Sequence, residues 1–179
     1  MNKEYRDDSL AKALLENSAL DLYAHILKEY TVEDLLALCY QTAHYRLAFR
    51  AAWTLEHVLL KDKALLSRYT PEVIELYLTT DNDSSLRSIS KLILQLLKTS
   101  PVSFTPQYQE DILCKTFRLI EKEDCPVALL VNCWDILYVL SKQHDWIPQE
   151  LQLHILFHLE KNPTPASKSR GNRILNRLR

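Results

Sequence analysis

The stretch YTPEV, residues 69–73, has the composition of a helix start. A threonine hydroxyl can accept a hydrogen bond from an amide of the first turn, and proline at the first helical position loses nothing because its nitrogen would be unpaired there anyway. Ile74 stands where a hydrophobic staple would place the apolar partner of Tyr69. The stretch therefore predicts that Thr70 is the N-cap of a helix beginning at Pro71.

Three related stretches occur elsewhere in the chain, at residues 30–33, 104–107 and 146–149. Each has an aromatic residue, a spacer, a proline or a substitute for it, and then Glu or Gln. The positions equivalent to Pro71 are 32, 106 and 148, so the stretches recur at intervals of 39, 35 and 42 residues. Intervals of this length are typical of proteins built from repeated helix pairs.

A second helical pattern follows each start, at residues 45–60, 83–97, 126–140 and 166–178. When Trp53, Ser90, Trp134 and Arg173 are aligned, a leucine or isoleucine falls two residues later in all four segments. We expect both tryptophans to be buried where the units stack. The pattern predicts one domain, residues 1–179, with capping helices in residues 1–29 and repeat units at 30–62, 69–99, 104–143 and 146–179.

Two short segments in these second helices resemble those of HEAT repeats. The second helix of a HEAT unit typically reads Asp-x-x-Val-Arg, and Asp83-Ser84-Ser85-Leu86-Arg87 looks like that pattern, as Phe49-Arg50-Ala51-Ala52 does in part. From about residue 30 to residue 178 the chain is similar to HEAT-like and armadillo-like α-solenoids. The resemblance implies an all-α fold: a right-handed α-α superhelix of about four antiparallel helix pairs, with one or two N-terminal capping helices.

Gly171 is the only glycine among the 179 residues. Phosphate-binding loops, dinucleotide-binding turns and nucleophile elbows need glycine where the backbone takes a positive φ or approaches a ligand closely. We therefore expect no catalytic residue and no cofactor. His154 and His158 have the spacing of two zinc ligands, but Ile155 replaces the general-base glutamate and no third ligand stands out nearby, so no metal is expected.

The composition predicts a cytoplasmic protein with no membrane association. The beginning of the chain is charged and lacks the apolar core of a secretory signal. The longest apolar stretch, residues 126–140, is shorter than a bilayer-spanning helix and carries Asn132 and Asp135. The four cysteines show no C-x-x-C spacing and are expected to be reduced; Cys125, among acidic residues, is expected to be structural.

Polar residues at three- and four-residue steps form a stripe along three of the second helices. In HEAT-like pairs these helices line the concave face, so the resemblance implies that the stripes lie side by side in one groove. The alternative is that they are solvated faces without a partner. The predicted binding ridge consists of Arg50, Thr54, His57, Arg87, Lys91, Gln95, Asn132, Asp135 and Tyr138.

The last fourteen residues hold five basic side chains and no acid, while the preceding 165 carry 17 basic and 23 acidic side chains. The basic end, which includes Arg170, Arg173 and Arg177, is expected to be a solvated terminal helix, with a patch for nucleic acid or for an acidic partner as the alternative.

These patterns favour a non-catalytic scaffold that binds a protein or peptide on its concave face. The alternative is a nucleic-acid-binding or DNA-glycosylase-like protein, because one family of alkylpurine DNA glycosylases is built on a HEAT-like fold, and Trp134, Asp135, Trp53 and Arg50 are similar to its groove in residue type. The acidic body of the chain disfavours that alternative. A homodimer through one end of the stack is a further expectation, because solenoid ends expose apolar surface.

Overall fold

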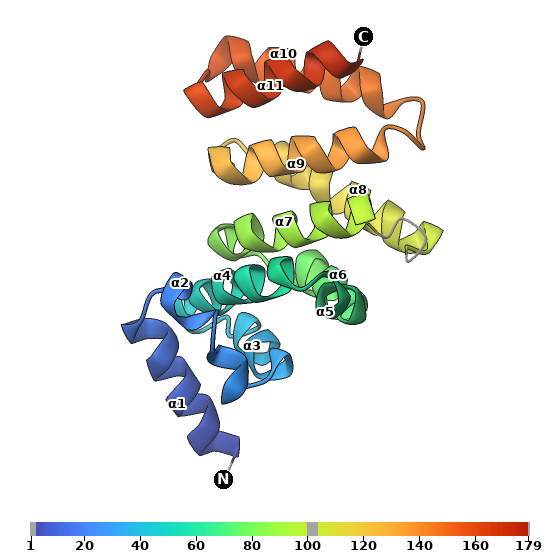
Figure 1. Ribbon diagram of the computed structural model, residues 1–179. Coiled ribbons are helices and arrows are strands. Elements are labelled where there is room, and N and C mark those ends of the chain that lie inside the picture. The colour runs from blue at the N-terminus through green and yellow to red at the C-terminus, as the bar shows by residue number, and fades with distance from the viewer. Residues whose placement is uncertain (1–2, 100–103, 179) are drawn as a thin grey trace. The chain divides into compact units, whose positions relative to one another are not determined.

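The computed structural model describes residues 3–99 and 104–178, and every regular element in these ranges is a helix (Figure 1). The elements are α1 (Lys3–Glu16), α2 (Ala19–Leu22), the 3-10 turn η1 (Ile26–Lys28), α3 (Val32–Cys39), α4 (Tyr45–Lys61), α5 (Lys63–Arg68), α6 (Thr70–Thr79), α7 (Asp83–Thr99), α8 (Pro106–Ile120), α9 (Val127–Leu140), α10 (Ile147–Lys161) and α11 (Pro165–Leu178). The all-α prediction is confirmed.

The four predicted second helices are present as α4, α7, α9 and α11, each within two residues of its expected bounds. At two of the other predicted helix starts a threonine side chain caps the helix. Thr31 accepts a hydrogen bond from the Asp34 amide while the Asp34 carboxylate accepts one from the Thr31 amide, which completes a capping box. Thr105 accepts from the amide of Tyr108 at 3.2 Å. These caps begin α3 and α8.

The prediction that Thr70 is an N-cap is wrong. A helix that was not predicted, α5, lies directly before this stretch, and Asp62 caps it by accepting from the amides of Ala64 and Leu65. Because α5 ends at Arg68, Thr70 is already the first residue of α6, and its hydroxyl donates to the Ser67 carbonyl at 2.8 Å. The Thr70 hydroxyl was expected to accept a hydrogen bond from an amide of α6, but it donates one to a carbonyl of α5 instead.

The chain divides into two compact units, Met1–Leu92 and Ile93–Arg179, and α7 passes from the first into the second. In unit 1, α3 packs against α4, and α1 and α2 also contact α4. The core of unit 1 includes the fully buried side chains of Leu35, Leu55, Ile74 and Tyr77. Since α1, α2 and α3 all contact α4, two of its polar residues, Thr54 and Glu56, are buried.

In unit 2, α9 is the central helix, contacted by α8, α10 and α11 (Figure 1). Trp134 of α9 is fully buried, which confirms its expected place in the core. The single glycine serves this packing, because a Cβ at Gly171 would lie 2.9 Å from Cγ2 of Ile155 and 3.5 Å from the indole of Trp134. Gly171 thus allows α11 to approach α10 and α9 closely.

Trp53 is only partly buried, so the expectation that it is a core residue is wrong. Its ring stacks on Phe49 with centroids 5.9 Å apart, and the guanidinium of Arg50 lies 5.3 Å from its centroid. The ring and cation neighbours of the indole, Phe49, Arg50 and His57, all come from its own helix. Among the residues that the structure describes, no helix is long and apolar enough to span a membrane.

Candidate functional site

Arg50 is occupied by contacts inside unit 1. Its Nε donates to the carbonyl of Leu14 at 2.8 Å, and its Nη2 donates to the carbonyl of Asn17. Both carbonyls lie at the C-terminal end of α1, where backbone acceptors lack helical partners. Arg50 therefore caps α1 and ties it to α4.

The other predicted ridge residues of α4 also face neighbouring groups. Thr54 is fully buried. The ring of His57 lies 5.5 Å from that of Tyr23 and 5.9 Å from that of Trp53. These positions leave Thr54 no surface for a partner molecule and give His57 two aromatic neighbours.

The predicted residues of α7 lie in different surroundings. Lys91 makes a 2.6 Å ion pair with Glu56, whose carboxylate is almost fully buried in unit 1. Arg87 is exposed on the part of α7 in unit 1, and Gln95 is half-buried on the part in unit 2. Lys91 neutralises a buried acid, so its ammonium is not a free binding group.

Unit 2 contains a pocket of about 530 Å³ into which several predicted residues converge. We call it the cationic pocket. Its lining comes from the end of α7, the end of α9 with the turn that follows, and α11. The lining residues are Leu97, Lys98, Asp135, Tyr138, Val139, Lys142, Gln143, Arg173 and Arg177.

Asp135 is the single acid in this lining. Only 8% of the residue is exposed, and its Oδ2 accepts from Nη1 of Arg170. Nη2 of Arg173 lies 3.6 Å from the other carboxylate oxygen. Burial raises the pKa of Asp135 above its ordinary value, against the opposing effect of the surrounding cations. Two arginines thus hold a poorly solvated carboxylate at the wall of the pocket.

Three further cations line the pocket without a salt bridge, although the charges of Lys98 and Arg177 also act on Asp135. Lys98, Lys142 and Arg177 are exposed and make no ion pair with any residue that the structure describes. Leu97, Val139 and the ring of Tyr138 supply apolar surface beside them. A concave site with surplus positive charge and an apolar wall can hold an anionic group together with its carbon chain.

The structure joins residues that the sequence separated into two sites. Asp135 and Tyr138 were predicted in the binding ridge, whereas Arg173 and Arg177 were predicted as a basic end. Asn132 lies one turn before Asp135 and is buried. The arginines recur at steps of three and four along α11, which indicates one face, but nothing in the sequence shows that this face meets α9.

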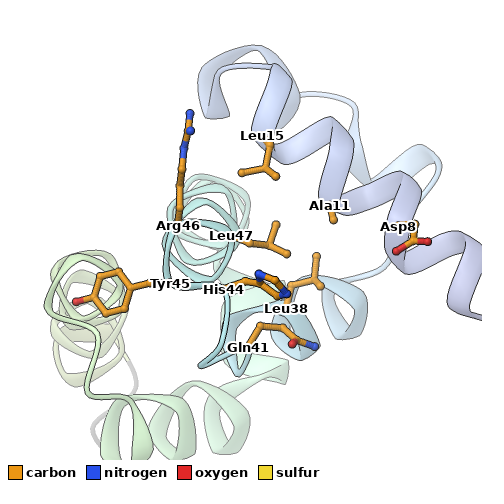
Figure 2. Close-up of a pocket in the computed structure, with 9 residues that line it drawn as sticks. All are labelled: Asp8, Ala11, Leu15, Leu38, Gln41, His44, Tyr45, Arg46 and Leu47. Atoms are coloured by element: carbon orange, nitrogen blue, oxygen red, sulfur yellow. The ribbon is translucent and has the colours of Figure 1, made fainter.

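A second cavity, of about 610 Å³, lies in unit 1 and contains none of the predicted ridge residues (Figure 2). Its floor includes Leu38 and Leu47, and Leu15 of α1 points toward them. Asp8 and Arg46 stand at its rim. Sequence reasoning missed it because it forms where α1 meets α3 and α4, and contact between segments far apart has no local signal.

His154 and His158 support the core. Nδ1 of His154 accepts from the indole nitrogen of Trp134 at 3.2 Å, so Nε2 carries the proton and donates to the Ile120 carbonyl at 3.0 Å. Both ring nitrogens of His154 are occupied by protein atoms. Burial lowers the pKa of both histidines, and the ring of His158 meets Trp134 edge-on at 5.4 Å.

Consecutive helices that pack as antiparallel pairs, α3 with α4, α8 with α9 and α10 with α11, define a helical-repeat protein. The sequence profile of the HEAT repeat domain family matches residues 6–178, and the chain belongs to this family. No curated protein sequence and no solved structure is similar enough to the chain to count as a match.

Proposed function

We propose that this HEAT repeat protein is a non-catalytic scaffold whose unit 2 binds an acidic segment of a partner protein in the cationic pocket. The observation that carries the proposal is the convergence on one concave site of Lys98, Lys142 and Arg177, which form no salt bridge with any described residue. They come from three separate segments, so the fold itself concentrates their charge. Free cations in a concave site attract anions and raise the rate of encounter with them.

The shape and lining of the pocket favour a peptide segment. A volume of about 530 Å³ accommodates a few side chains. Glutamate or aspartate carboxylates can pair with the lysines and Arg177, while the methylene groups lie against Leu97, Val139 and Tyr138. This combination of charge and apolar surface suits an acidic peptide that also carries apolar residues.

Nucleic acid is the weaker candidate for the same pocket. Asp135 places a carboxylate in the lining, where it would repel a phosphate backbone. The sequence of unit 2 carries eleven basic and nine acidic side chains, so it lacks the broad positive surface on which non-specific nucleic-acid binding depends.

We also place the scaffold in the cytoplasm. All four cysteines are free thiols, and two of them, Cys39 and Cys133, are buried. Free thiols are the usual state of cysteine in a reducing compartment.

Fluorescence anisotropy with a labelled oligoglutamate peptide and the full chain tests the proposal. Arg177→Glu should weaken binding by about tenfold or more, because it replaces a free cation of the pocket with an acid. Lys168→Glu is the matched control, since it makes the same charge change on the same helix at an exposed residue outside the pocket lining.

The control separates the pocket from general attraction to the basic C-terminal helix. Equal losses in the two variants, or no binding by the wild type at low salt, would contradict the pocket. If the wild type bound duplex DNA or RNA more tightly than the peptide, and Arg177→Glu abolished that binding, the partner of the pocket would be a nucleic acid and not a protein.

A further inference from the structure

Unit 1 contains a smaller pocket, of about 270 Å³, which shares Gln41 and Tyr45 with the cavity shown in Figure 2. We call it the aromatic pocket. Its lining comes from the end of α3 with the turn that follows, the start of α4, and the end of α6 with the turn that follows. The side-chain amide of Asn82 donates to the Tyr45 carbonyl at 3.0 Å, and its side-chain oxygen accepts from the Ser85 amide. Asn82 therefore fixes the turn between α6 and α7 against the start of α4.

Two tyrosines line the aromatic pocket beside small apolar side chains. Tyr40 is 44% exposed and Tyr45 is 54% exposed, so both rings keep surface that the protein leaves uncovered. The buried residues Cys39 and Ala48 supply the apolar part of the lining. The face of an aromatic ring carries negative charge density and attracts cations. The volume is smaller than that of a site for a drug-sized molecule, so it suits a compact group.

The charges of the aromatic pocket are acidic. Asp81 is the only charged residue of its lining, which includes no lysine, arginine or histidine. Burial raises the pKa of Tyr40, and the negative charges of Glu75 and Glu72 raise it further. Two carboxylates of α6 therefore stand close enough to act on the Tyr40 hydroxyl.

Basic side chains near these segments lie outside the aromatic pocket. His44 and Arg46 line the neighbouring cavity instead, and Figure 2 shows the Arg46 side chain pointing away from Tyr45. Arg87 lies one turn of α7 beyond Asp83 and is not part of the lining. The helix dipoles oppose one another, because α3 and α6 end at the pocket while α4 and α7 begin there. Side-chain charge therefore favours a cation over an anion.

We propose that the aromatic pocket binds an N-methylated ammonium group, the chemistry that trimethyllysine and choline share. The faces of Tyr40 and Tyr45 and the carboxylate of Asp81 attract the positive charge, while the methyl groups lie against Cys39 and Ala48. An unmethylated ammonium is more strongly hydrated and gains less from such a lining. This site does not rest on the cationic pocket, which lies in the other unit and attracts the opposite charge.

A nuclear magnetic resonance titration of the ¹⁵N-labelled full chain with choline chloride tests the site, at an ionic strength held constant with sodium chloride. Amide shift changes should be largest in residues 40–45 and 79–82. The control ligand is 3,3-dimethylbutan-1-ol, which has the shape of choline without its charge. It should bind more weakly by about fivefold or more, because it cannot use the ring faces as a cation does.

Two variants test the residues that supply the attraction. Tyr45→Leu should weaken choline binding by about fivefold or more, since it keeps an apolar side chain but removes the ring. Its control, Tyr108→Leu, changes a tyrosine of unit 2 outside the pocket and should bind choline like the wild type. Asp81→Asn should weaken binding by about threefold, whereas Asp145→Asn, at an exposed acid of unit 2, should not.

Short peptides that differ only in one lysine or trimethyllysine identify the source of the group. If the trimethyllysine peptide binds more tightly than choline, the ligand is a methylated side chain of a partner protein; the reverse order assigns a free quaternary amine. The proposal would be overturned by absence of shift changes at the pocket, or by equal binding of choline and the alcohol. Undiminished binding by Tyr45→Leu, or equal binding of the two peptides, would also overturn it.

Discussion

The helices α4 of unit 1 and α9 of unit 2 carry similar polar stripes but use them differently. In α4, Arg50 donates to backbone carbonyls of α1 and its end, and Thr54 is buried. In α9, Asp135 meets the arginines of α11, and Tyr138 lines a pocket with three more cations that form no salt bridge with a described residue. What packs against a polar stripe thus decides whether it stabilises the fold or lines a binding site.

The charged residues of the two units also differ in how they are paired, and this leaves a surplus of positive charge in the pocket of unit 2. In unit 1 the lysine of α7 meets a buried acid, because Lys91 pairs with Glu56. In unit 2 the pocket brings four cations of its lining toward one acid, Asp135. The Lys91–Glu56 pair has no net charge, whereas the lining of the cationic pocket has a net positive charge. Of these two groups, only the pocket can attract an external anion.

The largest expected effect concerns the two tryptophans. Trp134→Ala should lower the free energy of unfolding by about 3 to 5 kcal/mol, because it empties an enclosed core site and removes the partner of His154. Trp53→Ala should cost less than half as much, since its indole is partly solvated. Urea denaturation measures the free energy of unfolding of both variants. Equal losses of stability would contradict the difference in burial between the two tryptophans.

The next effect concerns the cap that α4 provides for α1. Arg50→Ala should cost about 2 kcal/mol, because it leaves the carbonyls of Leu14 and Asn17 without their charged donor. Arg46→Ala, on the same helix at an exposed position, should change stability by less than about 0.5 kcal/mol. Hydrogen exchange at α1 amides should rise in the first variant only. Unchanged protection there would contradict the capping role.

A smaller effect should appear in the cationic pocket. Asp135→Asn removes the only negative charge of the lining and frees Arg170 and Arg173, so it should tighten binding of the oligoglutamate peptide by about three- to tenfold. Asp145→Asn, at an exposed acid of unit 2 that does not line the pocket, should leave affinity unchanged. Weaker binding by Asp135→Asn would show that this carboxylate contributes to recognition.

The smallest expected effect is on the pH dependence of stability. Burial holds the pKa of His154 below its ordinary value of 6.5, so the unfolded chain binds the proton more readily than the folded one. Stability from this group is complete above that value and is lost as the pH falls through the folded pKa.

Denaturation at a series of pH values checks this effect. His154→Gln should show a smaller loss of stability on acidification than the wild type, and some loss should remain because the pKa of His158 is lowered in the same direction. Identical slopes for the two proteins would contradict a buried neutral His154.

Local patterns of the sequence were sufficient to predict the second helices of the pairs, α4, α7, α9 and α11. Thr31 and Thr105 cap helices through hydrogen bonds to residues three positions away, so their role is encoded nearby. Thr70 has the same local pattern, but Asp62 begins an additional helix before it and the cap is not formed. A short helix such as α5 has too few turns to give a clear apolar period.

The cationic pocket could be predicted only in part. The stripe of Asp135 and the basic face of Arg173 and Arg177 were both visible in the sequence, as separate features. Arg170 follows Asp135 by 35 residues, on a different helix, and helical periodicity gives no information about which faces meet. The partners of Arg50 are backbone carbonyls, which have no signature in a sequence.

The most direct test of the cationic pocket is a nuclear magnetic resonance titration of the ¹⁵N-labelled chain with the oligoglutamate peptide. If unit 2 is the binding unit, the largest amide shift changes should occur at Lys98, Tyr138, Lys142 and Arg177, and unit 1 should change little. Changes centred on the unit 1 cavity near Tyr45 and Arg46, or spread evenly over both units, would contradict the proposed site.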